Sequence, residues 1–289
     1  MTLRRREFLA ISGVLPFVLS CGSADAPTSP SRAVPSSPRS IFQQDFNTAA
    51  VGTYGPEALA AGWLDATADT GVRQGRTTVI EGAGAHEGRS LRVIYPKGAV
   101  GASAGGALWS MRIGRFEELY CSYYVRFDPD FDFVKGGKLP GLAGGAANTG
   151  GVKPTGSDGW SARMMWRAGG EVVQYVYHAD QPTIYGEDFR WNLGGRRVFR
   201  PGSWHRVEHR IVINSPGQRN GIVQGWFDGV LALDRRDVRF RDVDAFAIDS
   251  FLFSTFFGGS DSTWAPQKPE GITFDQFVIA RGTAGPTLL

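Results

Sequence analysis

The chain has 289 residues, 42% of them hydrophobic, and a formal net charge of +3 at pH 7. This length suffices for one large domain or two small ones, and the 39 glycines and 16 prolines indicate many turns. No apolar run reaches about 18 residues, so the sequence predicts no transmembrane helix.

Residues 1–20 have the pattern of an export signal rather than of a folded element. Arg5 and Arg6 precede a short apolar stretch, which is typical of twin-arginine signals. The stretch ends in "VLSCG", which resembles a lipobox with Cys21 as the lipidated residue. The alternative is an ordinary signal peptide that happens to contain a cysteine. Residues 21–40 are rich in Ser, Pro and Ala and predict a disordered tether.

This segment determines the expected location and partners. Cleavage before Cys21 would remove three arginines and one glutamate and lower the formal charge from +3 to +1. No global positive field would then attract nucleic acid. We expect an exported monomer, a lipoprotein of the bacterial cell envelope (periplasm, outer membrane or cell surface) that contacts membrane only through its lipid. The other cysteine, Cys121, alternates with apolar residues and is predicted to lie in the core.

Past residue 40 the apolar residues recur with a period of two, which predicts β-strands. The predicted strands cover residues 90–96, 106–114, 119–127, 160–167, 171–178, 204–214, 221–234, 248–259 and 271–280. Asp228-Gly229 predicts a tight hairpin within one of them, and residues 55–63 predict a short helix. The pattern favours one all-β domain from about 41 to 285, a β-sandwich of jelly-roll type with a concave substrate groove.

The segment "FDFVKGGKLPGLAGG", residues 131–145, places Lys135 and Lys138 among glycines. We expect an irregular loop after a strand, whose backbone lies close to an anionic ligand while Lys138 contacts it. Lys135 is expected to be a solvated residue at the rim.

Residues 160–180 bring together a possible catalytic group. Ser161 and Arg163 share one strand face, and Tyr175 and Tyr177 share a face of the next strand. With a three-residue loop between the strands, Arg163 lies opposite Tyr175. Ser161 then lies opposite Tyr177. With a two-residue turn the register shifts by one, and Ser161 faces His178 instead.

The first register favours proton transfer. A guanidinium about 4 Å from a phenol can lower the phenol pKa by up to roughly three units from its reference near 10. This would bring a tyrosine into range as a general base. The alternative is that paired tyrosines simply pack well across two strands.

Three motifs in order resemble polysaccharide lyase family 14, which comprises alginate and glucuronan lyases on a jelly-roll scaffold. They are "GGKLPGL" at 136–142, S-x-R at 161–163 and Y-x-Y at 175–177. The flanking "YYVRFDPDFDF" and the later "FFGG" are also similar, and the resemblance covers most of residues 90–280. It implies a polyuronate substrate, no cofactor, and functional residues at Lys138, Ser161, Arg163, Tyr175 and Tyr177.

The implied reaction is β-elimination. A base removes the C5 proton beside the C6 carboxylate, and the C4–O bond breaks. Lys138 and Arg163 would neutralise the carboxylate, and Ser161 would orient it. Tyr175 and Tyr177, one or both, would transfer protons. The sequence leaves open which tyrosine acts and whether Lys138 is itself the base.

Two further residues are candidates for substrate binding. Arg112 either grips a second carboxylate or is a solvated surface residue, and Trp264 either stacks on a sugar or packs on its own sandwich. His205 and His209 share a strand face, but no third ligand is evident, so no metal site is predicted.

Two other functions compete with the lyase. A jelly-roll glycoside hydrolase needs paired carboxylates, and the E-x-D-x-x-E arrangement is absent from the sequence. A non-catalytic lipoprotein that binds polyuronate at the cell surface would need the groove and its cations but not the tyrosine pair. The choice among mannuronate, guluronate and glucuronate, and between endo and exo action, also stays open.

Overall fold

The computed structural model describes residues 39–282, with Arg39 described only in its backbone. The predicted signal peptide, Cys21 and nearly all of the predicted tether lie outside the described residues. The tether prediction was too long at its end, because Arg39 and Ser40 belong to strand β1 (Arg39–Gln44). Residues 39–282 contain no helix with the length and apolar character needed to cross a bilayer.

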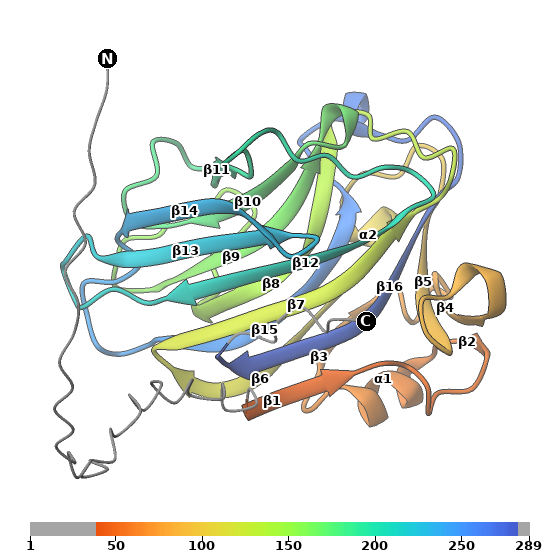
Figure 1. Ribbon diagram of the computed structural model, residues 1–289, viewed down its shortest axis with the longest axis horizontal. Coiled ribbons are helices and arrows are strands. Elements are labelled where there is room, and N and C mark those ends of the chain that lie inside the picture. The colour runs from red at the N-terminus through yellow and green to blue at the C-terminus, as the bar shows by residue number, and fades with distance from the viewer. Residues whose placement is uncertain (1–38, 283–289) are drawn as a thin grey trace, which may run out of the picture. The chain divides into compact units, whose positions relative to one another are not determined.

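The described residues form two antiparallel β-sheets that pack face to face (Figure 1), which confirms the predicted β-sandwich. The first sheet has nine strands, with β1 paired beside β16 and the others in spatial order: β14 (Val230–Val238), β13 (Gly221–Phe227), β12 (Trp204–Val212), β7 (Glu118–Phe127), β16 (Glu270–Arg281), β5 (Arg89–Tyr95), β4 (Thr77–Glu81) and β2 (Gly52–Thr53); β1 spans Arg39–Gln44.

The second sheet has seven strands and carries the candidate site. In spatial order they are β11 (Glu187–Arg190), β10 (Val172–Tyr177), β9 (Gly159–Arg167), β8 (Gly136–Gly145), β15 (Ile248–Phe257), β6 (Ala107–Phe116) and β3 (Thr67–Thr70). The helices are short: α1 (Pro56–Gly62), α2 (Gly101–Ala104) and the 3-10 turns η1 (Gly82–Gly84), η2 (Ala168–Gly170) and η3 (Ser262–Trp264).

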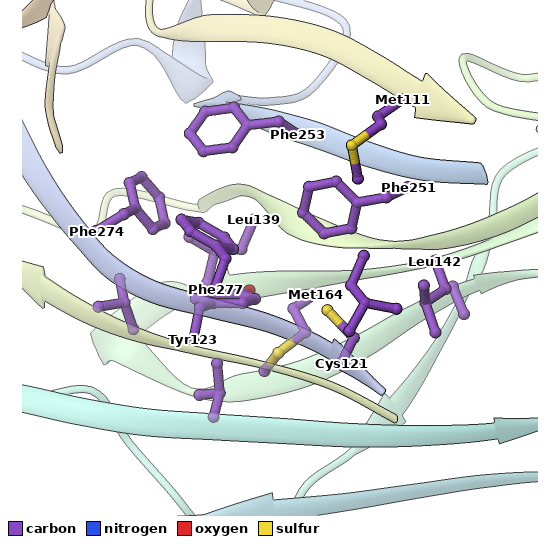
Figure 2. Packing of buried hydrophobic residues seen from close by; sticks show 14 of the residues in the cluster. Met111, Cys121, Tyr123, Leu139, Leu142, Met164, Phe251, Phe253, Phe274 and Phe277 are labelled. Carbon is purple, nitrogen blue, oxygen red and sulfur yellow. The ribbon is translucent and has the colours of Figure 1, made fainter. Parts of the chain in front are cut away.

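Alternate side chains of both sheets meet in one aromatic core between the layers. Figure 2 shows this packing, with Met111 and Phe251 from the second sheet and Tyr123 and Phe277 from the first. Cys121 lies in the same cluster and is 1% exposed, so the predicted core position is confirmed. Because one face of each strand is committed to this core, the opposite face of the second sheet is free to form a site.

The predicted hairpin and helix are both present. β13 and β14 are joined by Asp228 and Gly229, which have φ of 49° and 80°. Positive φ at both central residues is the requirement of a type I′ turn, which matches the twist of the flanking strands. Helix α1 lies within the predicted range 55–63.

The expected loop at residues 131–145 was wrong for most of its length, because residues 136–145 form strand β8 in the middle of the second sheet. The glycines reflect close packing rather than irregular backbone. A Cβ on Gly137 would lie 2.1 Å from the Trp166 ring, and one on Gly144 would lie 1.8 Å from the Ala247 carbonyl oxygen. Lys138 is therefore held by a rigid strand between two neighbours.

Candidate active site

The site lies on the outer face of the second sheet, where β8, β9 and β10 run side by side. Arg163 pairs with Tyr175, and Ser161 pairs with Tyr177. The Arg167 N–H donates to the Glu171 carbonyl at 2.8 Å, which leaves the three residues of the η2 turn between them, so the first of the two predicted registers is confirmed. On the other side of β9, Lys138 of β8 pairs with Met165, which shares the outer face with Ser161 and Arg163.

A cavity of about 620 Å³ opens over these strands. Four of the predicted site residues, Lys138, Arg163, Tyr175 and Tyr177, line it together with the predicted substrate contact Trp264. The remaining lining residues come from β6, β9, β15 and three loops: Leu108, Thr149, Gly150, Arg167, Tyr185, Gly186, Phe256, Gly258, Gly259 and Ser260.

Lys138 reaches the centre of this group as a half-buried side chain. Its Nζ donates a hydrogen bond to Met165 Sδ at 2.9 Å and lies 3.9 Å from the centroid of the Tyr175 ring. Burial lowers the pKa of Lys138 well below its usual value, and the charges of Arg163 and Arg167 lower it further. The amine is therefore able to be neutral, and to accept a proton, at a pH where a solvated lysine is charged.

Arg163 is a buried cation, with 3% of its surface exposed. Nη1 donates to Ser254 Oγ at 3.2 Å, and Nε has no hydrogen-bond partner among the described residues. Burial lowers the pKa of Arg163 to about 10, while Tyr177 and Tyr175 act in the opposite direction. At neutral pH this is still a positive charge, and it forms no salt bridge with any carboxylate that the structure describes, so an anionic ligand in the cavity can supply its counter-charge.

The two tyrosine rings stand perpendicular, with centroids 5.5 Å apart and an interplanar angle of 85°. Arg167 and Arg163 do lower the pKa of Tyr175, but the prediction that a guanidinium would bring this phenol into range as a general base is wrong. Burial raises the pKa of Tyr175, the neighbouring Tyr177 raises it further, and Arg167 and Arg163 offset only part of this. Removal from water outweighs the cations here, so Tyr175 keeps its proton and is suited to donate it.

Tyr177 connects the sheet to the loop at residues 146–158. Its Oη accepts a hydrogen bond from the backbone N–H of Gly151 at 3.1 Å. Only 1% of this residue is exposed, although its phenol borders the cavity. The position of the phenol therefore depends on the conformation of the loop.

Ser161 is placed beneath that loop rather than in the cavity. It is fully buried, does not line the cavity, and its Oγ donates to the Asn148 carbonyl at 2.6 Å. The expectation that Ser161 orients a substrate carboxylate does not agree with this position, because its donor is already used. Asn148 in turn donates to Asp158 at 2.9 Å. Ser161 thus anchors the loop that carries Gly151.

The two predicted substrate contacts differ in position. Arg112 is exposed on the outer face of β6, where it pairs with Ser250, and it does not line the cavity. This position agrees with the solvated alternative. Trp264 is half-buried and forms part of the cavity wall.

Sequence reasoning missed Met165 and Arg167, although both continue the alternation of Ser161 and Arg163 on β9. That alternation was the available signal. Arg167 forms a salt bridge with Asp188 of β11 and lies 5.4 Å from the Tyr175 ring. The cavity residues Tyr185 and Phe256 gave no comparable signal, because only the folded sheet brings their segments to β9.

No group of three potential metal ligands occurs in the described part of the chain. His205 accepts at Nε2 from the backbone N–H of Arg200, and its Nδ1 donates to Asp228 Oδ2 at 2.9 Å. His209 is fully buried, and neither of its ring nitrogens has a described partner. The two histidines are therefore parts of the fold between β12 and its neighbours.

Comparison with known proteins identifies the family. The model of the family Polysaccharide lyase 14 matches residues 83–277. The structure of alginate lyase Aly36B is 29% identical, with a TM-score of 0.73 over 85% of this chain and 98% of that one. The alginate lyase of Aplysia kurodai (24% identity, TM-score 0.71, 84% and 99% covered) and the endo-β-1,4-glucuronan lyase of Trichoderma reesei (15%, 0.51, 84% and 96%) share the fold. A search of curated proteins finds no match.

Solved complexes of Aly36B contain alginate oligosaccharides. One holds a tetrasaccharide in a variant with a lysine and a tyrosine replaced by alanine, and another holds a trisaccharide in a variant with a lysine and a methionine replaced. The family match extends over more than half of the present chain. The chain therefore belongs to polysaccharide lyase family 14 and is a polysaccharide lyase.

Proposed function

We propose that this lyase cleaves a polyuronate, with alginate as the first candidate and glucuronan as the second, by β-elimination. The observation that carries the proposal is the buried Arg163 guanidinium, which forms no salt bridge with any described residue and lies beside Lys138 and Tyr175 in a single cavity. A neutral sugar would leave that cation without a counter-charge, whereas a uronate carboxylate supplies one. The likeness to Aly36B, which is named an alginate lyase, supports the same choice of substrate.

Each group has a role that its environment permits. Arg163 binds the C6 carboxylate and stabilises the charge that develops on it as C5 loses its proton. Lys138, whose pKa is lowered by burial, accepts that proton in its neutral form. The C5–H electron pair forms the C4–C5 double bond, the C4–O bond breaks, and Tyr175 donates its proton to the leaving oxygen. Met165 supplies an acceptor that holds the Lys138 amine in place.

Two residues support this arrangement from outside the reacting atoms. Tyr177 contacts Tyr175 and is held by the Gly151 amide. Ser161 keeps the same loop in position through Asn148. We therefore assign Ser161 as a positioning residue rather than as a group that binds the carboxylate.

The assay is the ultraviolet absorbance of the new double bond when purified protein is mixed with polymannuronate, polyguluronate or glucuronan. We expect a steady increase on at least one polymer. Measurable binding to these polymers without any product would contradict the elimination and favour the non-catalytic reading.

The location remains a separate proposal, supported by the N-terminal sequence alone. The twin arginines, the apolar stretch and Cys21 support export followed by lipidation, and the cell envelope would then be the place of action. Labelling of cells with a fatty-acid analogue should mark the natural protein and not a Cys21→Ser variant. Equal labelling of both would contradict lipidation at this residue. A monomeric state is likewise a proposal, to be measured by light scattering.

A further inference from the structure

One wall of the cavity is formed by the loop after β15 and by the end of β9. The loop contributes Gly258, Gly259, Ser260 and Trp264, and β9 contributes Arg167. A Cβ on Gly259 would lie 2.2 Å from three atoms of the indole, so one face of the Trp264 ring packs directly on the backbone of its own loop. This support fixes the orientation of the ring, and the rest of the indole borders the cavity.

Two cations lie close to this indole. Lys135 Nζ is 6.0 Å from the ring centroid and donates to Thr263 Oγ1 at 2.6 Å. Arg167 Cζ is 5.9 Å from the Trp264 ring and 5.4 Å from the Tyr175 ring, so the guanidinium links the indole to the reaction centre. Arg167 is neutralised by Asp188. Lys135 is exposed and does not itself line the cavity; it interacts electrostatically with Asp261 but forms no salt bridge with any residue that the structure describes.

The Trp264 indole and the Lys135 ammonium together favour one class of ligand, a sugar that carries a carboxylate. An aromatic face packs against the C–H groups of a sugar ring and removes apolar surface from water. An ammonium beside it pairs with a carboxylate through a charge-assisted hydrogen bond. A neutral sugar would use only the indole, and a small anion would use only Lys135. A uronate residue uses both.

We propose that Trp264, Lys135 and Arg167 form a second uronate subsite, which binds the sugar residue next to the one that is cleaved. This inference rests on the proposed function, because it takes the Lys138–Tyr175 pair as the reaction centre. The subsite does not contact the reacting atoms. It contributes affinity for longer chains, and it sets the length of oligosaccharide at which cleavage becomes efficient.

The test uses alginate oligosaccharides of increasing length with the full chain and its variants. In Trp264→Ala, the ratio of kcat/KM on the hexasaccharide to that on the shortest cleaved oligosaccharide should fall by about tenfold. Lys135→Met should lower the same ratio by a smaller factor, and added salt should shrink the difference from wild type, because exposed charges are screened. Gly259→Ala keeps the indole but displaces it, and should resemble Trp264→Ala.

The matched control is Lys97→Met. Like Lys135, Lys97 is exposed and does not itself line the cavity, but it is not one of the cations beside the Trp264 ring, so its loss should leave the ratio at the wild-type value. Circular dichroism melting verifies that each variant is folded. If Trp264→Ala and Lys135→Met lower activity equally at every chain length, or not at all, the subsite is overturned while the proposed reaction stands.

A binding measurement separates the two proposals. In a Lys138→Ala background, calorimetry with an alginate tetrasaccharide should show that Trp264→Ala weakens binding by about tenfold. If the wild-type chain cleaves no polyuronate but this loss of affinity is observed, the subsite stands and the elimination is wrong. If affinity is unchanged, the subsite is wrong whatever the wild-type activity.

Discussion

Substitution of Lys138 by arginine distinguishes a base from a fixed charge. Replacement by a neutral residue cannot do so, because both roles predict a large loss. A charge about 4 Å from a carboxylate at an effective dielectric near 20 contributes about 4 kcal/mol, or roughly a thousandfold in rate. Loss of a general base costs a comparable factor of about 10²–10⁴. Arginine retains the charge but cannot release its proton.

The structure therefore predicts that Lys138→Arg and Lys138→Met both lose at least about a hundredfold in kcat. The Lys138 amine lies 2.9 Å from Met165 Sδ and 3.9 Å from the centroid of the Tyr175 ring, so both substitutions change a group at the reaction centre itself. The wild-type pH profile should rise through an ionisation well below the usual lysine pKa, because burial lowers the pKa of Lys138. The assay is initial rate by ultraviolet absorbance between neutral and alkaline pH.

Stability provides the control for these variants. The unfolded chain protonates Lys138 at a higher pH than the folded chain does, so burial of this amine costs folding free energy at neutral pH. Lys138→Met should therefore unfold at the same temperature as wild type or higher. An arginine variant with activity within tenfold of wild type would refute the assignment of Lys138 as the base and leave it only a charge.

Three further outcomes follow from the contacts of the site and the core. Tyr177→Phe removes the oxygen that accepts a hydrogen bond from the Gly151 amide at 3.1 Å. It should lower kcat at least about tenfold and leave oligosaccharide affinity unchanged. A rate within about twofold of wild type would reject the supporting role of Tyr177. Ser161→Ala leaves the Asn148 carbonyl without its 2.6 Å donor and should cost about 1–3 kcal/mol of unfolding free energy, measured by denaturant titration, together with a lower kcat; unchanged stability would contradict the anchor. Burial lowers the pKa of His209 to about 3. Below pH about 6.5, the ordinary histidine pKa, the unfolded chain therefore binds a proton at His209 that the folded chain does not bind. The unfolding free energy of the wild type should then fall by up to about 1.4 kcal/mol per pH unit as the pH drops below about 6.5. His209→Leu should remove that part of the slope, and identical slopes would exclude the effect.

Much of the fold was predictable because most strands bury one face only. Alternation of apolar and polar residues then reports both the strand and the face, as in the strand that contains Cys121. The same reasoning placed Arg163 with Ser161 on one face of its strand, and Tyr175 with Tyr177 on one face of the next strand. The choice between the two registers was not predictable, because the two turns differ by one residue and both are physically available. Packing of the folded sheet selected the three-residue loop.

Strand β8 escaped prediction for a different reason. Glycine and proline are poor strand formers, and the segment has no alternation of its own. Its extended conformation is imposed by β9 and β15 on either side, and its glycines are required by the Trp166 ring and the Ala247 carbonyl, which are distant in sequence. Such information is not local, so a reading of residues 131–145 alone suggests a loop.

For Tyr175, the sequence predicted the position of the side chain but not the direction of its pKa shift. The sequence places a guanidinium next to the phenol, which favours the charged form. It does not reveal that only 6% of the Tyr175 residue is exposed, and burial outweighs the nearby cations. A predicted neighbour therefore determines the direction of a pKa shift only when the depth of burial is also known.

The tight fit of β8 divides the molecule into parts that tolerate change differently. Gly137 and Gly144 leave no space for even a methyl group, so the strand that carries Lys138 has few acceptable substitutions. The walls above it are loops, where insertions and exchanges cost little stability. Efforts to redirect this lyase toward another acidic polymer should therefore randomise residues 146–158 and 258–264, except the loop anchors Asn148, Gly151 and Asp158 and the closely packed Gly259, and leave the floor of the cavity intact.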